Sequence, residues 1–194
     1  MSTDGVDNSR RTFLVGLTAG VGAAGAAVAA VPFVMSWMPS AKAKAAGAPI
    51  TIDISKVDTG GFVIYEWRGK PVWILRRTPE MIADLPKLND GLRDPESAEE
   101  QQPAYAKNAT RSIKPEVLVL LGVCTHLGCS PRYEKQPTVD LQYGGFFCAC
   151  HGSKYDFAGR VYKGVPAPLN LQVPPHYYQS ESVIVIGEEK EAAA

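Results

Sequence analysis

The feature that most constrains this chain is a concentration of sulfur and imidazole side chains between residues 124 and 151. All the cysteines of the 194-residue chain lie there (Cys124, Cys129, Cys148 and Cys150), together with His126 and His151. They form two short runs, Cys-Thr-His-Leu-Gly-Cys and Cys-Ala-Cys-His-Gly-Ser, which residues 130–147 separate. Such clustering indicates a metal site, a disulfide or both. The fold therefore has to bring two loops together.

Each run places a cysteine and a histidine close enough to reach one metal centre, and two cysteines are left over. A c-type haem site would need Cys-x-x-Cys-His, which neither run contains. Zinc with mixed nitrogen and sulfur ligands remains open. So does a binuclear iron–sulfur cluster with cysteines on one iron and histidines on the other. Zinc fingers usually pair cysteines in one run and histidines in another, so the mixed runs favour the cluster.

The N-terminal segment predicts export and a membrane anchor. Arg10 and Arg11 precede an apolar run, as in the twin-arginine export signal of bacteria. No charged residue occurs from Phe13 to Ala41, which exceeds the roughly 20 residues needed to cross a bilayer. Cleavage at Ala41-Lys42-Ala43 or Ala43-Lys44-Ala45 is the alternative, but the length of the run favours an uncleaved transmembrane helix.

We divide the chain into a cytoplasmic tail with the twin-arginine motif, a transmembrane anchor, a flexible tether, a globular domain and a C-terminal tail. The respective ranges are 1–12, 13–39, 40–48, 49–188 and 189–194. The tether is rich in alanine and glycine, and its sequence leaves open whether it is helical or extended. The export signal predicts that the domain lies in the periplasm, on a single-pass anchor in the bacterial inner membrane.

The domain is predicted to be mainly β, an antiparallel β-sandwich with little helix. Strands are expected where β-branched and aromatic residues run or alternate, at 50–54, 62–67, 72–75, 117–123 and 182–186. Arg68-Gly69-Lys70 is predicted to be a hairpin turn, and Thr78-Pro79 to start a short helix. Residues 90–112 are interpreted as a solvated surface loop, and His176 as a surface histidine.

Lysine plus arginine and aspartate plus glutamate both total 20, so the net charge is zero. No basic surface indicates nucleic acid as a partner.

The two cysteine and histidine runs resemble the cluster-binding loops of Rieske proteins from cytochrome bc complexes, in particular the proteobacterial type. The similarity extends over most of the chain, through Tyr155-Asp156, Gly159-Arg160, the proline-rich turn 164–170, the anchor and the tether. It implies a Rieske domain with a small cluster-binding subdomain at about 122–171. Val165 is a departure, since many members run from glycine directly into proline at that turn.

The resemblance implies one Rieske [2Fe–2S] cluster and a role for each site residue. Cys124 and Cys148 would bind the inner iron, His126 and His151 the outer iron, and Cys129 and Cys150 would form a disulfide between the loops. The resemblance carries the remaining cofactor-binding roles over to Ser153, Tyr155, Leu127 and Gly128. The two hydroxyls would donate to a cluster sulfur and a ligand thiolate, and Leu127 would cover the exposed histidines.

The function implied is a quinol–cytochrome-c reductase subunit, an oxidoreductase and translocase active within its complex. Electrons would pass from membrane quinol to a c-type cytochrome, with proton release on the periplasmic side. His151 would contact quinol and accept its proton, with His126 as its neighbour in the catalytic pair. The implied partners are cytochrome b, a c-type cytochrome, quinol and the lipid bilayer, in a dimeric complex. The alternatives are the small Rieske subunit of a periplasmic oxidase, such as arsenite oxidase, and a non-redox zinc module.

Overall fold

A computed structural model of the chain describes residues 7–189. Half of the N-terminal tail predicted at 1–12 and nearly all of the C-terminal tail predicted at 189–194 therefore lie outside the described residues. The chain forms two compact units, Met1–Ala45 and Ala46–Ala194, and each is described by itself.

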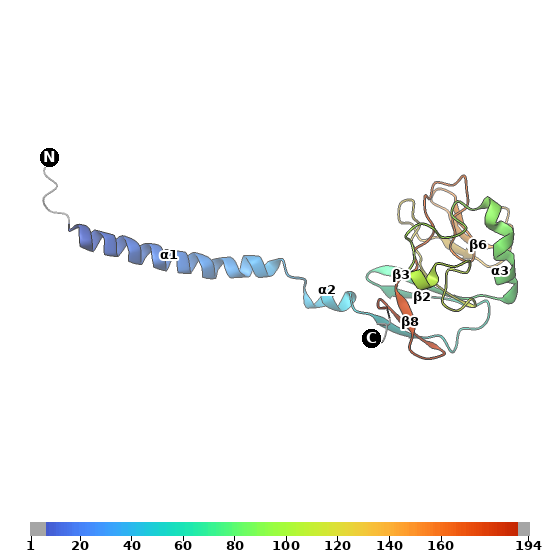
Figure 1. Ribbon diagram of the computed structural model, residues 1–194, viewed down its shortest axis with the longest axis horizontal. Coiled ribbons are helices and arrows are strands. Elements are labelled where there is room, and N and C mark those ends of the chain that lie inside the picture. The colour runs from blue at the N-terminus through green and yellow to red at the C-terminus, as the bar shows by residue number, and fades with distance from the viewer. Residues whose placement is uncertain (1–6, 190–194) are drawn as a thin grey trace. The chain divides into compact units, whose positions relative to one another are not determined.

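The first unit consists mainly of the helix α1 (Asn8–Ser36), blue in Figure 1. Its N-terminus is capped by Asp7, whose carboxylate accepts the backbone N–H groups of Ser9 and Arg10. At about 1.5 Å per residue, α1 is roughly 43 Å long, more than the roughly 30 Å hydrocarbon core of a bilayer. Among the described residues, one helical segment meets the length and apolarity needed to cross a membrane.

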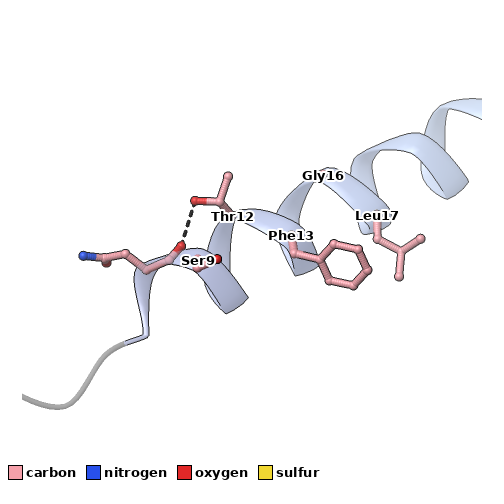
Figure 2. Close-up of a pocket in the computed structure, with 6 residues that line it drawn as sticks. Ser9, Thr12, Phe13, Gly16 and Leu17 are labelled. Carbon is pink, nitrogen blue, oxygen red and sulfur yellow. Dashed lines mark hydrogen bonds between the residues drawn. The ribbon is translucent and has the colours of Figure 1, made fainter.

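One face of α1 carries a shallow hollow lined by Asn8, Ser9, Thr12, Phe13, Gly16 and Leu17 (Figure 2). The Thr12 hydroxyl donates to the backbone carbonyl of Asn8 at 2.8 Å, so this polar group is satisfied within the helix. A side chain at Gly16 would meet no other atom within 4 Å. This face of the anchor is therefore open for a neighbouring helix or lipid chain to approach.

The segment predicted to be the tether contains a short helix, α2 (Ala41–Ala46). The Ser40 hydroxyl accepts the backbone N–H of Ala43, and the Ser40 carbonyl accepts that of Lys44. The question that the sequence left open is thus answered in favour of helix at 41–46. A helix of this length has little stability of its own in water, because few hydrogen bonds offset its nucleation.

The second unit is built on three antiparallel sheets of three strands each. The first has the order β1-β9-β8 (Ile50–Asp53, Val183–Ile186 and His176–Tyr178). The second has the order β2-β3-β4 (Phe62–Trp67, Lys70–Arg76 and Val117–Leu121), and the third β5-β6-β7 (Arg132–Glu134, Gly145–Cys148 and Ser153–Tyr155). The helices of the unit are α3 (Pro79–Asp84) and the short 3₁₀ segments η1 (Leu85–Gly91) and η2 (Ala104–Ala106). The unit is therefore mainly β, as predicted, with strands β2, β3, β6 and β8 labelled in Figure 1.

In the β2-β3-β4 sheet, called the middle sheet below, β3 and β4 are buried on both faces while β2 is partly exposed. Burial on both faces explains why β4 is apolar at every position. Val72 and Ile74 of β3 pack into a core shared with strands β1 and β9. Trp73 and Leu75, which alternate with them, pack into a second core with Phe146 of β6. The middle sheet thus joins the base of the domain to the part that carries the cysteines.

The β2–β3 hairpin turns at Arg68 and Gly69, which both have positive φ, 53° and 70°. This is the backbone of a two-residue turn that matches the twist of paired strands. The turn predicted at Arg68-Gly69-Lys70 is therefore one residue too long, because Lys70 already pairs with Trp67.

The interpretation of residues 90–112 as solvated is wrong for part of that segment. Leu92, Ser97, Ala106, Arg111 and Ser112 are buried. The polar members can be buried because they find acceptors within the domain, as the Arg111 guanidinium does at the Ala158 carbonyl, 3.1 Å away. The segment is a packed part of the domain that contains η2.

His176 is also buried, with 1% exposure, so its prediction as a surface residue is wrong. Its ring Nδ1 lies 2.8 Å from the Pro174 carbonyl, and its backbone N–H donates to the Tyr105 hydroxyl at 2.7 Å. The ring also packs edge-on against Tyr105. Burial lowers the pKa of His176 because the charged form would lose its hydration.

Candidate metal centre

Two loops carry the cysteines and histidines, and both follow buried strands. The first, residues 124–129, begins shortly after β4, where Gly122 lies against the indole of Trp73. The second, residues 149–152, joins β6 to β7, whose end residues Cys148 and Ser153 face each other across the hairpin. The packed strands therefore fix the position of both loops.

The two loops have the same local turn. In the first, the Gly128 N–H donates to the Cys124 carbonyl at 3.0 Å; in the second, the Gly152 N–H donates to the Cys148 carbonyl at 2.9 Å. Both glycines have positive φ, 86° and 77°, a conformation that strains other residues. The expectation of two similar loops around one centre agrees with this geometry.

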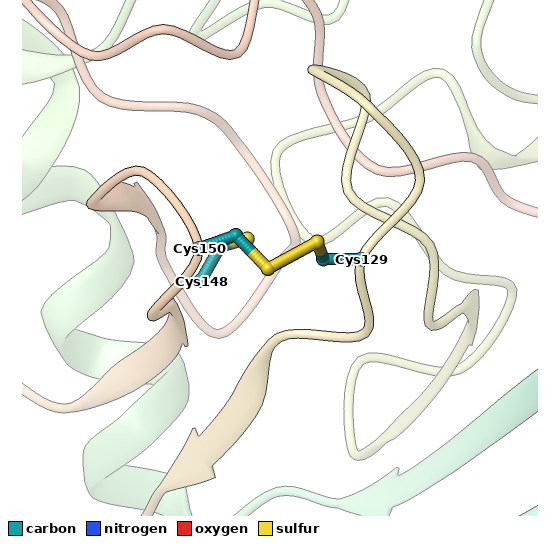
Figure 3. A group of neighbouring side chains, drawn as sticks. All are labelled: Cys129, Cys148 and Cys150. Atoms are coloured by element: carbon teal, nitrogen blue, oxygen red, sulfur yellow. A yellow bond between two sulfur atoms is a disulfide. The ribbon is translucent and has the colours of Figure 1, made fainter.

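Sulfur atoms from the two loops meet at a disulfide between Cys129 and Cys150 (Figure 3). This is the pairing that the resemblance implies. The sulfur of Cys148 lies within 4.8 Å of both disulfide sulfurs, but these two are bonded to each other and are not free to bind a metal. The free thiols are Cys124 and Cys148, each 2% exposed.

The imidazoles of His126 and His151 lie next to each other, with ring centroids 4.7 Å apart and ring planes nearly perpendicular. His151 is exposed and His126 half-buried, in contrast to the buried thiols. Leu127 is 72% exposed beside them, and a side chain at Gly128 would meet no atom within 4 Å. The thiols therefore lie on the inner side of the site and the imidazoles on its outer side.

Hydroxyl groups surround the inner side. The Tyr155 hydroxyl lies 3.1 Å from the Cys124 sulfur and accepts the backbone N–H of Thr125 at 3.2 Å. Since it accepts from Thr125, its own proton is available for the sulfur. The buried Ser153 hydroxyl accepts the Ala167 N–H at 3.1 Å, which likewise leaves its proton for another acceptor.

The electrostatic environment keeps these donors protonated. Burial raises the pKa of Tyr155, and the neighbouring Cys124 sulfur raises it further, so the hydroxyl stays neutral well above pH 7. Burial also raises the pKa of the Cys148 thiol, while the backbone N–H groups of Cys150 and His151 act in the opposite direction. Those N–H groups would favour a thiolate at Cys148.

A third loop, residues 164–170, contributes to the inner side through the Ala167 N–H and through the Leu169 carbonyl, which accepts the Thr125 hydroxyl at 2.7 Å. Val165, the departure noted in this turn, is half-buried and packs against the core beneath the site. Gly164 has a φ of 72°, so the positive-φ residue of the turn remains a glycine. The fold thus accommodates valine at position 165, because its side chain packs against the core.

Sequence reasoning missed Thr125 and Asn170. Thr125 ties the first loop to Tyr155 and to the third loop. The Asn170 side chain accepts the Val161 N–H at 2.8 Å and donates to the Asp94 carbonyl at 3.0 Å, so it fastens the third loop to the 90–112 segment. Thr125 could have been suspected from its place inside the first run, but no local pattern identifies the long-range partners of Asn170.

The donor set fits a binuclear iron–sulfur cluster. Two buried thiols and two outward imidazoles from paired loops match cysteine ligation of one iron and histidine ligation of the other. A tetrahedral zinc ion would use the same two sulfur and two nitrogen atoms, but all four would bind a single metal ion.

Two family models match the chain. The model described as "Ubiquitinol-cytochrome C reductase Fe-S subunit TAT signal" matches residues 1–40, and the model "Rieske [2Fe-2S] domain" matches residues 96–175. The second match covers both loops and decides between the two metals in favour of the [2Fe–2S] cluster.

The chain is also similar to curated proteins over nearly its full length. It is 53% identical to the ubiquinol-cytochrome c reductase iron-sulfur subunit of Allochromatium vinosum, with all of this chain and 95% of the relative covered. It is 46% identical to the subunit of the same name from Blastochloris viridis, covering 96% of this chain and 97% of the relative. Among solved structures, a chain of a "Hyperthermophilic respiratory Complex III" is 26% identical, with a TM-score of 0.49 over 88% of this chain and 97% of that one.

Proposed function

Because the chain belongs to the iron–sulfur subunits of ubiquinol–cytochrome c reductases, we propose that it takes electrons from membrane quinol and passes them to a c-type cytochrome. Electron transfer runs through its Rieske [2Fe–2S] cluster, and the chain acts as one subunit of a larger oxidoreductase complex. We further propose that Cys124 and Cys148 bind the inner iron, and that His126 and His151 bind the outer one.

One observation carries the ligand assignment: the fold leaves two thiols free and buried, and it sets two imidazoles side by side on the outer surface. The disulfide between Cys129 and Cys150 removes the other two cysteines from the ligand set. Disulfides persist in oxidising compartments, so the bond agrees with a periplasmic domain. The Tat signal supports export, and the length and apolarity of α1 support a membrane anchor.

When bound, the cluster supplies a one-electron acceptor, and its two histidine ligands give it a higher potential than four thiolates would allow. The chain's own residues then hold and move the proton. His151 is exposed, so the ring nitrogen that would not bind the metal is accessible to a quinol hydroxyl. In neutral imidazole this nitrogen carries a proton, so it would first release that proton to solvent and could then accept the proton of the quinol hydroxyl. Release of that proton into the periplasm would account for translocation.

Leu127 and Gly128 shape the surface around that nitrogen. Leu127 projects an apolar side chain beside the imidazoles, and Gly128 adds no side chain that would block approach. An apolar rim around one exposed polar nitrogen suits the ring of a quinol, which carries its hydroxyl on an apolar body.

The partners proposed are cytochrome b, which would hold the quinol, and a c-type cytochrome as electron acceptor, in a dimeric complex. α1 would be a single-pass anchor in the inner membrane of a bacterium, with its N-terminus in the cytoplasm. The domain would move between the two partners on the tether 40–48. The marginal stability of α2 supports such movement, since a six-residue helix can open and reform at little cost.

A pair of histidine variants tests the ligand assignment. His151→Gln, in the full chain within its complex, is expected to abolish both the reduced-state paramagnetic resonance signal and quinol-dependent reduction of cytochrome c. His176→Gln replaces a buried histidine outside the loops and is expected to keep the signal. A wild-type spectrum for His151→Gln would refute the ligand assignment.

The full-length similarity to reductase subunits favours this function over the small subunit of a periplasmic oxidase. Co-purification with b- and c-type haem distinguishes the two, because an oxidase of that kind needs no cytochrome b.

A further inference from the structure

Three arginines lie inside the domain with almost no contact with water. Arg77 and Arg160 are 1% exposed and Arg111 is 0% exposed. Among residues 7–189, Asp156 is the acidic side chain with comparable burial, at 0%. The interior therefore holds three positive groups and one negative group, an imbalance that is costly unless the chain gains from it.

Of these three arginines, Arg77 and Arg111 bind neutral acceptors only. Arg160 is paired with Asp156, whose Oδ2 lies 2.7 Å from the Arg160 Nε. Arg77 donates to the carbonyls of Pro115, Thr110 and Phe157 and to the Ser112 hydroxyl. Arg111 donates to the carbonyls of Ala158 and Gly159 and to the Gln102 side chain. Apart from the Arg111 Nε–H, which has no partner among the described residues, such contacts satisfy N–H groups but leave the positive charge uncompensated.

The acidic groups that influence these two arginines besides Asp156 are closer to solvent. Glu116 acts on Arg77 and is exposed, and Asp94 acts on Arg111 and is half-buried. Burial lowers the pKa of both Arg77 and Arg111 to about 10, so both remain protonated at neutral pH. Three buried positive charges and one buried negative charge leave a net interior charge of about +2.

Two of these arginines contact the turn that follows Tyr155. The Arg77 Nη1 lies 3.0 Å from the Phe157 carbonyl, and the Arg111 Nη1 lies 3.1 Å from that of Ala158. These carbonyls belong to the turn that directly follows Tyr155, whose hydroxyl is 3.1 Å from the Cys124 sulfur. The arginines thus surround the backbone that positions a donor to a proposed ligand.

We propose that Arg77, Arg111 and Arg160 raise the reduction potential of the cluster through their buried positive charge. This inference rests on the ligand set proposed above. Uptake of one electron, which quinol supplies in the proposed reaction, turns one ferric ion into a ferrous ion and breaks no bond. The sum of two ferric ions, two sulfides and two thiolates changes from zero to minus one. A fixed positive charge in the domain interior therefore stabilises the reduced form more than the oxidised form.

The size of the effect follows from Coulomb's law. At an effective dielectric constant of about 20, a charge about 15 Å from the cluster would change the reduction equilibrium constant roughly sixfold, and a closer charge would change it more. This corresponds to about 46 mV at about 59 mV per tenfold for one electron. Exposed charges have a much smaller effect because water and salt screen them.

The arginines also fasten neighbouring carbonyls, so a variant can change the potential by loosening the site. The sign of the change separates the two causes. Loss of positioning would lower the potential whichever charge is removed, because hydroxyl donors would be displaced. Loss of charge lowers the potential when an arginine is neutralised and raises it when Asp156 is neutralised.

The experiment is a redox titration of the full chain within its complex, followed by the reduced-state resonance signal. Arg111→Gln is expected to lower the reduction equilibrium constant roughly sixfold, while Arg111→Lys, which keeps the charge, leaves it within about twofold. Asp156→Asn is expected to raise it by a similar factor. Lys107→Gln removes an exposed charge from the same segment as Arg111 and is expected to leave the potential unchanged.

Equal losses for Arg111→Gln and Arg111→Lys, or a lowered potential for Asp156→Asn, would overturn the proposal. Should Arg111→Gln fail to fold, Arg77→Gln against Arg77→Lys makes the same comparison at the second unpaired arginine. Absence of the resonance signal from the wild-type chain would instead contradict the ligand set, so the two failures are distinguishable.

Discussion

At the scale of single residues, we expect hydroxyl groups to determine how readily the site accepts negative charge. Ser153 and Tyr155 follow the second loop in β7, and both keep a proton free for sulfur because each already accepts a backbone N–H. The resemblance to a known family implied that these two hydroxyls donate to a cluster sulfur and a ligand thiolate. The acceptor bonds that orient them, from Ala167 and Thr125, come from other loops and could not be derived from local sequence.

Ser153→Ala removes one of these donors without adding volume. A hydrogen bond to a charged group contributes about 1.5–3 kcal/mol, so we expect the midpoint potential to fall by roughly 60–130 mV for one electron. Redox titration of the reduced-state signal measures the shift, and the size of the signal reports cluster content. An unchanged midpoint with full cluster content would exclude Ser153 as a donor.

The disulfide is a second feature that depends on single residues. Replacing both Cys129 and Cys150 by serine opens a connection across a sequence separation of 21 residues. The loop-closure model predicts a loss of roughly 3 kcal/mol in the free energy of unfolding. Chemical denaturation of the variant, with the wild-type chain under reducing conditions as a comparison, measures this loss. Equal stability of the variant and the oxidised wild-type chain would contradict a stabilising role.

Among the secondary-structure elements, the middle sheet connects the base of the domain to the metal centre. The sequence predicted its strands because they are rich in β-branched and aromatic residues. The apolar run of β4 indicated a buried strand, but the sequence could not indicate which sheets pack against the two faces of β3 and β4. For the same reason the burial of 90–112 was missed, because the acceptors of its polar side chains lie far away in sequence.

Gly122→Ala tests the packing between β4 and the first loop. A methyl group at Gly122 would overlap the indole ring of Trp73, which is 2% exposed and cannot move aside freely. Overpacking of this kind costs roughly 1–3 kcal/mol. Thermal denaturation of the full chain measures the loss. Gly91→Ala is the control, because its new methyl group would meet Tyr162 only at an ordinary 3.9 Å. Equal stabilities for the two variants would contradict the packing.

α2 tests the proposed motion of the domain. Prolines at Ala43 and Ala45 would replace this easily opened helix by a stiff, extended segment, because proline fixes φ and proline-rich linkers act as semi-rigid spacers. We expect quinol-dependent turnover of the complex to fall severalfold while the cluster spectrum stays unchanged. Serine at the same two positions is the control for side-chain change. Undiminished turnover in the proline variant would count against movement through this segment.

For the whole molecule, the order of the parts along the chain determines where the site operates. Residues 13–36 of the predicted anchor lie in one continuous helix that begins near the twin-arginine pair; the helix ends at Ser36, so residues 37–39 of that prediction lie outside it. The predicted β domain is a separate compact unit. Both were accessible from sequence, because long apolar runs and alternating strands are strong local signals. The mixed cysteine and histidine runs already indicated that loops 124–129 and 149–152 meet at one centre. The disulfide pairing and the role of each ligand came from the resemblance to a known family, since contacts between distant loops leave no local pattern.

Replacing Arg10 and Arg11 by lysine tests the proposed topology. A receptor reads the paired arginines, so a conserved positive charge should not rescue export. We expect the domain to become protected from protease added to spheroplasts, whereas the wild-type domain is digested. Lys42→Arg with Lys44→Arg is the control for charge beyond the helix. Normal protease accessibility of the lysine pair variant would exclude the twin-arginine route.

The most direct test of the whole account is a determination of iron, zinc and acid-labile sulfide in the native protein, purified without added metal. The account predicts two irons and two sulfides per chain, with a resonance signal that appears on one-electron reduction. Zinc without labile sulfide would contradict this function, because zinc does not accept an electron. The proposed cluster ligands and the proposed effect of the buried arginines on the potential would then both be wrong.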